Sequence, residues 1–439
     1  MEQMKKIRVA MICHFSNSDV RSHLPLDNRK LYGFARKVLR MPQKKMTYGD
    51  IAPWDTSSIQ FFRDQENIEL YVISAHSGLK KDVVSFFDKK VTYYFLNCDV
   101  ATLLKRIIPN DGLWRRMNPM VGRVRRIVNQ VKPDIVVLFG TENAYYSGTV
   151  LGLKGYPVYV LCQTIYNNPE REKYDFVDSK NASTEREIFK KERYFGVYSK
   201  KHFDLLRELV PGAFVFKFGF PNKGILLEPV SCRKKYDFVN FAMGMSEKKG
   251  YTDAIEATAI VKKNHPEVKL NLVGSWDDTI KKTLDDLVSK YQLQQNVEIT
   301  PFFPKQSDMF LHIQQSRFAL LPCKMDHISG TMLQAMQLGL PLVVYKTTGT
   351  PSLNKEKRCV LIAELDNVEE LAMHMTALME DSDLADELRK NARANQERKA
   401  EIERQNGGRL IKNFYSIIEN YRFGKPIPND QLFNPKQDD

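Results

Sequence analysis

The alternation of short apolar runs with longer amphipathic stretches is the feature that most limits the fold of this 439-residue chain. The first run, IRVAMIC at 7–13, begins the pattern, and CVLIAEL at 359–365 is the last run. Nearly continuous apolar runs are typical of parallel strands that are buried on both faces, and the intervening stretches are long enough for the covering helices. The pattern therefore predicts an α/β fold.

Two series of such strands are predicted, with a break between them. The first series comprises 7–13, 68–75, 91–97, 134–140, 157–163 and 194–199, and the second comprises 237–244, 268–274, 297–303, 318–323, 341–347 and 359–365. The intervening segment 221–237 is rich in Pro, Gly and charged residues and has no clear period, which is typical of a linker. Each series suits one Rossmann-like domain.

Chain length agrees with two domains, because single hydrophobic cores stop growing at roughly 250 to 300 residues. We predict an N-terminal domain over 1–220 and a C-terminal domain over 221–400. A strongly helical stretch covers about 383–422, and the helix at 401–425 is expected to pack back on the first domain. The end of the chain, 426–439, contains prolines and acids and is expected to be loose.

Composition narrows the classes of function. The net charge of +13 suggests an anionic partner, such as a nucleotide, a membrane surface, a phosphorylated acceptor or a nucleic acid. The six cysteines form no CxxC pair, which indicates neither a disulfide framework nor a zinc site and fits a cytoplasmic protein. No window approaches 18 uninterrupted apolar residues, so no membrane-spanning helix is expected. No DNA or RNA recognition motif is present, so nucleic acid is not an expected partner.

Residues suited to a phosphate group follow strands of the second series. In GMSEKKG, Gly244 allows a tight turn, and Lys248 and Lys249 supply cations. In VGSWDD, Trp276 is a candidate wall for a nucleotide base. A solvated lysine turn and a core tryptophan are the alternative interpretations of these residues.

A third segment, CKMDHISGTMLQAM, opens a predicted helix with Ser329, Gly330 and Thr331. Helix N-termini favour anions, because free N–H groups and the helix dipole meet there. Ligands of open parallel sheets lie beyond the carboxyl ends of the strands. Three such segments on one sheet therefore predict a binding site for an anion, such as the phosphate end of a nucleotide.

The order of these motifs resembles glycosyltransferase family 4, the glycosyl transferases group 1. The resemblance rests on KKG with AIEA, then LNLVGS, NVEITPFFP and SRFALLPCKMDHISGTMLQAMQLGLPLVV, within which AMQLGLP is the most specific part. The first half matches only in layout and in VKPDIVVLFGTEN. The resemblance implies a GT-B fold, in which two Rossmann-like domains with parallel sheets face each other across a cleft. It also implies that the C-terminal domain binds the nucleotide-sugar donor and the N-terminal domain the acceptor.

The resemblance carries roles onto particular residues. The two glutamates of the family pattern fall at Asp326, which would hold donor-sugar hydroxyls, and at Gln334, which would bind the ribose. Lys249 matches the family lysine that neutralises the leaving diphosphate. The family arginine falls in 243–245, where this chain has none, and Lys248 would replace it without the planar donor set of a guanidinium.

Catalysis by fixed charges and N–H groups requires neither a metal nor a cofactor. The only D-x-D, at Asp381 and Asp383, is interpreted as a helix cap and not as a cation site. The changed Arg and Glu positions leave open a second class of function, a catalytically weakened protein that binds a sugar nucleotide or a protein partner.

Three residues of the first half are candidates for the acceptor side. His14 and Arg21 follow the first strand, in a loop without the GxGxxG of a dinucleotide site, which argues against a dehydrogenase. Glu142, in LFGTEN, follows a buried strand and would orient an acceptor hydroxyl or the donor sugar. A structural histidine and a helix-capping carboxylate are the competing interpretations.

Basic and apolar residues are interleaved over 103–132. This pattern suits a helix lying on anionic lipid, where a lipid-linked acceptor would be found, although a solvated helix face has the same composition. The stretch at 30–45 has a similar character. An anionic membrane surface is therefore an expected partner, at the inner face of the cytoplasmic membrane.

These observations predict a hexosyltransferase that moves a sugar from a nucleotide-sugar to a glycan or lipid-linked acceptor without a metal. Retention of anomeric configuration is implied by the resemblance alone. A role in making a cell-surface polysaccharide, such as a capsule, lipopolysaccharide or exopolysaccharide, is implied in the same way.

Overall fold

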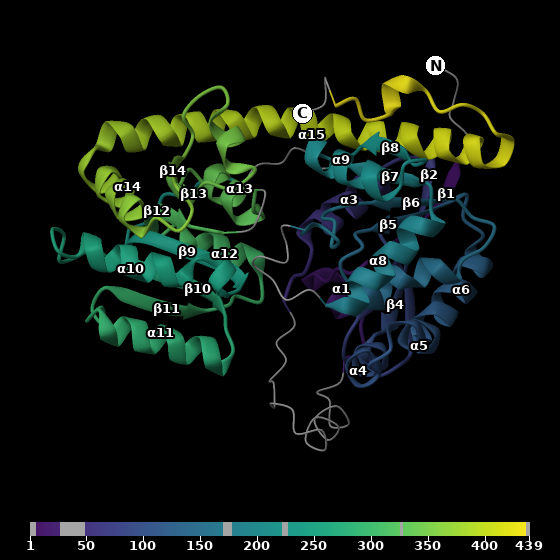
Figure 1. Ribbon diagram of the computed structural model, residues 1–439, viewed down its shortest axis with the longest axis horizontal. Helices are drawn as coiled ribbons and strands as arrows, with labels where there is room; N and C mark the ends of the chain where they lie inside the picture. Colours follow the sequence, from purple (N-terminus) through teal and green to yellow (C-terminus); the bar gives the residue numbers. More distant parts are fainter. Residues whose placement is uncertain (1–5, 27–48, 170–177, 222–226, 325–327, 436–439) are drawn as a thin grey trace. The chain divides into compact units, whose positions relative to one another are not determined.

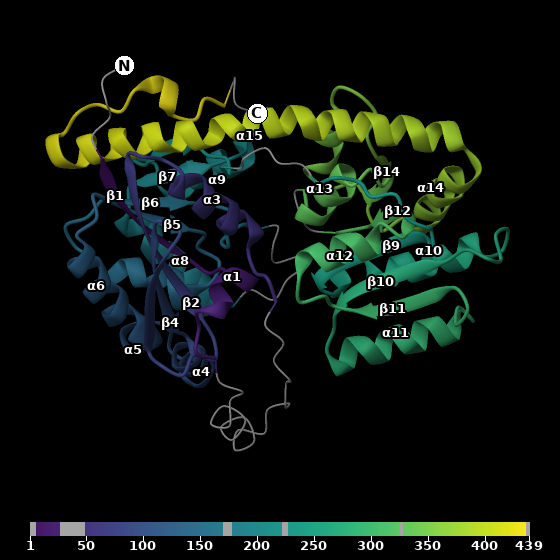
Figure 2. The ribbon, with the colours of Figure 1, turned by 180° about the vertical axis from the view of Figure 1, so that it is seen from behind.

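The protein is described by a computed structural model that covers residues 6–26, 49–169, 178–221, 227–324 and 328–435. The chain divides into two compact units, which are Met1–Lys223 together with Ile402–Asp439, and Gly224–Glu401. Each unit contains one β-sheet with helices on both faces (Figures 1 and 2). The predicted α/β architecture with two largely parallel sheets is confirmed.

The sheet of the first unit has the strand order β3-β4-β2-β1-β5-β6-β7-β8. Its strands are β1 (Ile7–Cys13), β2 (Ile68–His76), β3 (Val83–Asp88), β4 (Val91–Asn97), β5 (Ile135–Phe139), β6 (Val158–Leu161), β7 (Tyr194–Val197) and β8 (Phe214–Lys217). All pairings are parallel except that of β3 with β4. The carboxyl ends of the parallel strands therefore lie along one edge, where the predicted His14 and Glu142 follow β1 and β5.

Helices cover both faces of this sheet. They are α1 (Ser18–Ser22), α3 (Pro53–Arg63), α4 (Asp99–Ile107), α5 (Asp111–Met117), α6 (Pro119–Val131), α7 (Ala144–Ser147), η1 (Gly148–Gly152), α8 (Ser179–Lys191) and α9 (Lys200–Leu209). Alternate residues of β1 face opposite sides, as the two-residue period of a strand requires. Val9 and Met11 pack with α3, whereas Ala10 and Ile12 pack with α4, α6, α8 and α9.

The second unit has a fully parallel six-stranded sheet in the order β11-β10-β9-β12-β13-β14. The strands are β9 (Tyr236–Gly244), β10 (Leu270–Ser275), β11 (Val297–Pro301), β12 (Ser316–Leu321), β13 (Leu342–Tyr345) and β14 (Leu361–Ala363). The helices are η3 (Glu247–Lys249), α10 (Tyr251–Val261), α11 (Asp278–Lys290), α12 (Gln306–Ile313), α13 (Gly330–Gln337), η4 (Thr350–Asn354) and α14 (Val368–Glu380). Helices α10, α11 and α14 pack on one face, and α12 and α13 pack on the other.

One long helix, α15 (Ser382–Phe423), contributes to both units, since the boundary between them falls between Glu401 and Ile402. The helical stretch predicted at about 383–422 is this helix, and the part predicted at 401–425 to pack back on the first domain belongs to the first unit from Ile402 onward (Figure 1). The second part of α15 packs against the first unit, where Phe414 lies 5.5 Å from Phe62 between ring centroids.

Strands β3 and β8 are missing from the sequence prediction. Strand β3 pairs with β4 through the two-residue turn Lys89–Lys90, and both lysines have positive φ, at 45° and 66°. Such turns normally carry Asn-Gly or Asp-Gly, so a Lys-Lys pair gives no turn signal. The strand is also an edge strand with an exposed side, and Phe87 on it is 71% exposed.

The end of the chain corrects a second prediction, because the described part of 426–439 is ordered against β8. The backbone N–H of Phe433 donates to the carbonyl of Val215 at 2.8 Å, and Leu432 forms a bridge with Phe216. Phe433 is buried and stacks on Phe203. Proline and acid content suggested a loose tail, but two buried apolar residues, Ile427 and Phe433, anchor it.

The basic stretch 103–132 is not one helix but parts of α4, α5 and α6. Most of its apolar side chains face the core: Trp114 is fully buried and α6 packs its apolar face into the first unit. The second basic stretch, 30–45, lies outside the described residues. Among the helices that are described, none is long and apolar enough to cross a membrane. All six cysteines are free thiols.

Candidate functional site

The carboxyl edge of the second sheet brings the loops after β9, β10 and β12 together. Ser275 at the end of β10 pairs with Gly244 at the end of β9, and the next residue, Met245, donates its N–H to the carbonyl of Ser275 at 2.8 Å. Gly244 is exposed, and a Cβ added there would meet no atom within 4 Å. The backbone at Gly244 is therefore open to a ligand.

The lysine loop after β9 is locked to the loop after β12. The N–H of Lys324 donates to the carbonyl of Lys248 at 2.9 Å, and the thiol of Cys323 lies 3.3 Å from the same oxygen. The ammonium of Lys249 is 3.8 Å from the Cys323 sulfur. The structure thus places Lys248 and Lys249 beside the loop that leads to α13.

Gly250 explains why this loop needs a glycine directly after the lysine pair. Its φ is +69°, in the left-handed region, and a Cβ at this position would overlap the carbonyl oxygen of Pro322. Only glycine satisfies both conditions. The close approach of the two loops therefore depends on the third residue of the KKG motif.

Helix α13 begins as predicted at Ser329, which is its N-cap. The Ser329 hydroxyl accepts from the N–H of Met332 at 3.3 Å and lies 2.9 Å from the hydroxyl of Thr331. The first-turn N–H groups of Gly330 and Thr331 have no acceptor within the helix, as at every helix start. Space around Gly330 is open, since no atom lies within 4 Å of an added Cβ.

The remaining donor-side candidates are less tightly placed. Trp276 is half-buried and packs on the core cluster that includes α10 and α11. A half-buried ring can belong to the core and still contact a nucleotide base, so the two interpretations are compatible. Gln334 is half-buried on α13, and its carbonyl accepts from the N–H of Leu338 at 3.0 Å. Asp326 lies outside the described residues.

A charged network behind these loops was not predicted from the sequence. Lys324 pairs with Asp253 at 2.8 Å and with Asp366 at 2.9 Å, and the Tyr345 hydroxyl donates to Asp253 at 2.6 Å. Burial alone would lower the pKa of Lys324, but its hydrogen bonds to the two carboxylates raise it. Lys324 therefore stays charged and fixes the start of α10 against the loop after β12. Residues so far apart in sequence carry no local signal of this contact.

In the first unit, His14 and Glu142 lie on the same edge of the sheet. The Tyr145 hydroxyl hydrogen-bonds to Nδ1 of His14 at 2.7 Å. The ring centroid of Tyr146 is 6.1 Å from that of His14, and the Tyr146 hydroxyl is 3.5 Å from Oε2 of Glu142. Burial, with a smaller effect from His76, lowers the pKa of His14 to about 4. His14 is therefore a neutral hydrogen-bonding group near pH 7.

The carboxylate of Glu142 folds back over Gly140. Gly140 has φ +80°, and a Cβ on it would overlap Glu142 Oε2. The glycine thus permits both the turn after β5 and the position of the carboxylate. The N-cap of α7 is Asn143, whose side chain makes no capping hydrogen bond.

Arg21 is placed differently from the other acceptor-side candidates. Its guanidinium donates to Asp50 and to the carbonyl of Gly49, both at 2.8 Å, and to the hydroxyl of Ser16 at 3.1 Å. The side chain is 12% exposed. These contacts give Arg21 a structural role in tying the loop after β1 to residues 49 and 50.

Asp55, on α3, is a residue that sequence reasoning missed. It is 2% exposed, and its Oδ1 has no hydrogen-bond partner among the described residues. Burial and then the charge of Glu142 raise its pKa well above the ordinary value. Both carboxyl groups also raise the pKa of Tyr146, after the larger effect of burial. In the sequence, an aspartate in the first turn of a helix is easily taken for a dipole partner.

The D-x-D segment acts as predicted, since Asp381 Oδ1 accepts from the N–H of Leu384 at the start of α15, at 2.9 Å. Among the residues described, no group of three or more His, Cys, Asp or Glu side chains is arranged to hold a metal ion.

Comparison with known proteins gives the family context of the second unit. Residues 228–395 match the family model described as glycosyl transferases group 1. An uncharacterized glycosyltransferase of Haemophilus influenzae is 23% identical over 137 residues, which are 31% of this chain and 37% of that protein. The match thus spans little more than a third of the length of this relative.

Solved structures resemble the chain over nearly its full length. Sucrose-phosphate synthase from Thermosynechococcus elongatus superposes with a TM-score of 0.68 at 14% identity, over 93% of this chain and 99% of that one. Anabaena HepE in complex with UDP-glucose gives 0.61 at 13% identity, over 93% and 100%. Segment 228–395 is therefore a glycosyl transferases group 1 domain, in a chain with the GT-B fold of glycosyltransferases.

Proposed function

We propose that the protein is a glycosyltransferase that moves a sugar from a nucleotide-sugar to a glycan or lipid-linked acceptor. The second unit binds the donor and the first unit binds the acceptor in this proposal. The observation that carries it is the lock between the loops after β9 and β12, which holds Lys249 beside Cys323 at the start of the segment leading to α13. The family match over the same unit supports it.

The proposed chemistry is the stabilisation of a leaving diphosphate by fixed positive charge. As the bond between the sugar and the diphosphate breaks, negative charge develops on the departing oxygens, and donors that are already oriented stabilise this charge without reorganisation. Lys249 is the proposed catalytic cation. The N–H groups of Gly330 and Thr331 are the proposed second set of donors.

The donor pocket in this proposal also uses residues whose role comes from the family resemblance. Asp326 would hold sugar hydroxyls and Gln334 the ribose, with Trp276 beside the base and Lys248 as an additional cation. Gly244 leaves its backbone accessible. The proposal needs neither a metal nor a cofactor, because the lysines supply the required charge.

On the acceptor side, Glu142 is the proposed group that orients an acceptor hydroxyl. His14 takes part as a neutral imidazole, since its lowered pKa keeps it uncharged. Arg21 contributes indirectly in this scheme, through the position of the loop after β1.

The finer parts of the proposal rest on relatives. HepE of Anabaena was solved with UDP-glucose, and TarM of S. aureus, similar at a TM-score of 0.53 over 67% of this chain, was solved with UDP and alpha-GlcNAc-glycerol. From these relatives we extend to this chain a uridine nucleotide; retention of configuration and a role in cell-surface polysaccharide synthesis at the inner face of the membrane are extended from the family resemblance alone.

A thermal-shift panel of UDP-, GDP- and ADP-sugars tests the proposal. A ligand that binds only the folded state raises the free energy of unfolding by RT ln(1 + [L]/Kd), and the melting temperature rises with it. One nucleotide class is expected to stabilise the protein and then to be turned over when an acceptor is added. Stabilisation without transfer to any acceptor, and without hydrolysis of the bound donor, would favour the catalytically weakened sugar-nucleotide-binding protein. The absence of stabilisation by every member would contradict both.

A further inference from the structure

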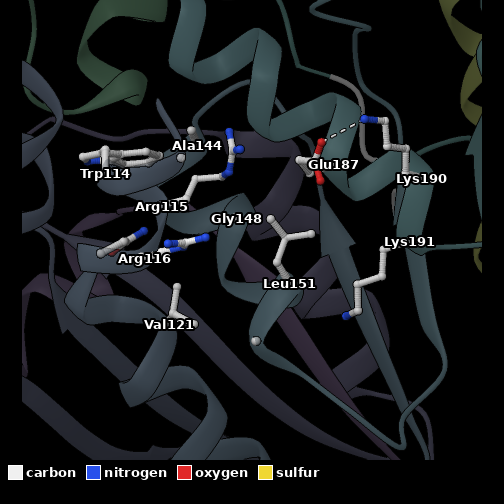
Figure 3. A pocket seen from close by; sticks show the side chains of 13 residues that line it. Trp114, Arg115, Arg116, Val121, Ala144, Gly148, Leu151, Glu187, Lys190 and Lys191 are labelled. Atoms are coloured by element: carbon white, nitrogen blue, oxygen red, sulfur yellow. Dashed lines mark hydrogen bonds and ion pairs between the residues drawn. The ribbon is translucent and has the colours of Figure 1, made fainter. Parts of the chain in front are cut away.

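The first unit contains a basic pocket that the proposed reaction does not use. Its volume is about 510 Å³, within the usual range of small-ligand sites. Its walls come from α5, α6, α7, η1 and α8 (Figure 3). Side chains that bear on its chemistry are Arg115, Arg116, Leu151, Glu187, Lys190 and Lys191.

The charges in this pocket are unequally neutralised. Lys190 pairs at 3.0 Å with Glu187, which is the only carboxylate among the described residues that line the pocket. Lys191 donates to the carbonyls of Val150 and Leu153 at 2.6 and 2.9 Å and also contacts a carboxylate outside the lining. The lysines are therefore largely satisfied by the protein.

The two arginines of the pocket form no ion pair among the described residues. Arg115 donates to the hydroxyl of Ser183 at 2.8 Å, a contact that orients the guanidinium without neutralising it. Arg116 is exposed, and no hydrogen bond or ion pair joins it to another residue in the described ranges. Figure 3 shows both side chains extending from α5 on the side of the pocket opposite the lysines.

The backbone that carries the arginines is fixed. Trp114 directly precedes Arg115 on α5. It is fully buried, and its Nε1 donates to the carbonyl of Ala101 at 3.3 Å. Asn118 caps α6 through the N–H of Met120 and donates to the carbonyl of Tyr145, both at 3.0 Å. The pocket wall is therefore held in place before any ligand binds.

Apolar side chains on the same helix lie exposed beside these arginines. Leu113 and Met117 are each 48% exposed, and they are four residues apart, so they share one face of α5. Ile107, at the end of α4, is 52% exposed. Exposed apolar side chains next to unneutralised arginines suit a ligand with an anionic head and an apolar tail.

We propose that this pocket binds a phosphate or diphosphate group through Arg115 and Arg116, and that the exposed face of α5 receives the chain of a lipid that carries it. Guanidinium groups match phosphate oxygens with paired donors, which a lysine cannot do. The proposal does not rest on the transfer reaction, because it concerns binding in the first unit alone.

Titration with inorganic pyrophosphate tests the anion site. Every protein in the comparison carries Lys249→Ala, so that uptake by the proposed donor site is reduced equally. Arg116→Gln and the double variant Arg115→Gln/Arg116→Gln are compared with Arg125→Gln/Arg126→Gln, which removes two exposed arginines of α6 outside the pocket. We expect the α5 variants to weaken binding by about tenfold or more and the α6 variant to change it little. Arg116→Gln guards against misfolding, because Arg116 has no described partner to lose.

Vesicle binding separates the two sources of the phosphate. Phosphatidylcholine vesicles with and without phosphatidylglycerol are compared for the same proteins and for Leu113→Ser/Met117→Ser. A lipid source predicts that the α5 arginine variants and the serine variant lose vesicle binding, while the serine variant keeps pyrophosphate binding. Pyrophosphate binding by the pocket without pocket-dependent vesicle binding would assign the site to a free anion and overturn the lipid part. No pyrophosphate binding, or equal losses in the α5 and α6 variants, would overturn the proposal.

Discussion

His14 and Asp55 lie at the same edge of the first sheet, and burial changes their pKa values in opposite directions. Burial disfavours the charged form of any group, so it lowers the pKa of a histidine and raises that of a carboxyl. His14 moves to about 4, and Asp55 moves upward with further help from Glu142. The two shifts make opposite contributions to the pH dependence of stability.

The histidine should cost stability in acid. Its folded pKa of about 4 lies below the unfolded value near 6.5, so the unfolded state binds more protons between these values and the free energy of unfolding falls as pH falls through this window. We expect a loss of no more than about 3 kcal/mol. His14→Gln should reduce that loss in denaturant titrations across the window, and an unchanged pH profile would show that His14 ionises normally.

The aspartate should cost stability as pH rises. Because its folded pKa lies above the unfolded one, the folded state binds more protons, and stability falls as pH rises from the unfolded pKa through the folded pKa. Asp55→Asn should therefore raise the free energy of unfolding more at pH 7 than near pH 3. Denaturant titrations at the two pH values measure this, and an Asn variant that is destabilised at pH 7 would contradict a buried carboxyl whose Oδ1 lacks a hydrogen-bond partner in the described residues.

Among the elements, α15 offers the sharpest test of packing, because two adjacent glycines on it have opposite surroundings. A Cβ at Gly407 would overlap the ring of Phe61 on α3, whereas one at Gly408 would meet no atom within 4 Å. Glycine at 407 is therefore needed for the close approach of α15 and α3. Glycine at 408 brings only the conformational cost of a glycine inside a helix.

Alanine at each position separates these effects. Gly407→Ala forces the Phe61 ring to move and should lower stability by about 1 to 3 kcal/mol. Gly408→Ala removes backbone freedom from the unfolded chain and should raise stability by roughly 0.5 to 1 kcal/mol. Thermal unfolding of the matched pair measures both. Equal shifts in the same direction would mean that α15 does not pack on α3 as described.

The sequence predicted elements where a buried strand or a cap leaves a local signal. Most of the parallel strands of the two sheets, the N-cap at Ser329 and the cap at Asp381 are examples. Strand β3 was missed because its Lys-Lys turn and exposed side resemble a loop. The end of the chain was misjudged because docking of Phe433 on β8 is a tertiary contact that prolines and acids do not reveal.

At the scale of the whole molecule, the chain pattern predicted two units, each with a largely parallel sheet, and motifs at strand ends supplied the candidate donor-site residues of the second unit. Contacts between segments that are far apart in the chain could not be predicted from the sequence. The pairing of Lys324 with Asp253, and the orphaned carboxyl of Asp55, depend on residues that only the fold brings together. The sequence shows that basic and apolar residues alternate over 103–132. It does not show which of them are buried in the core and which line the basic pocket.

The central claim is that Lys249 stabilises the diphosphate as the sugar leaves. Single-turnover sugar transfer, measured with the donor selected by the panel, tests it for Lys249→Ala against Lys263→Ala, an exposed lysine just beyond α10. We expect Lys249→Ala to transfer sugar about 10² to 10³ times more slowly than the unmodified protein, with a much smaller change in acceptor affinity. Lys263→Ala should transfer sugar at the rate of the unmodified protein. Equal transfer rates in all three proteins would contradict it.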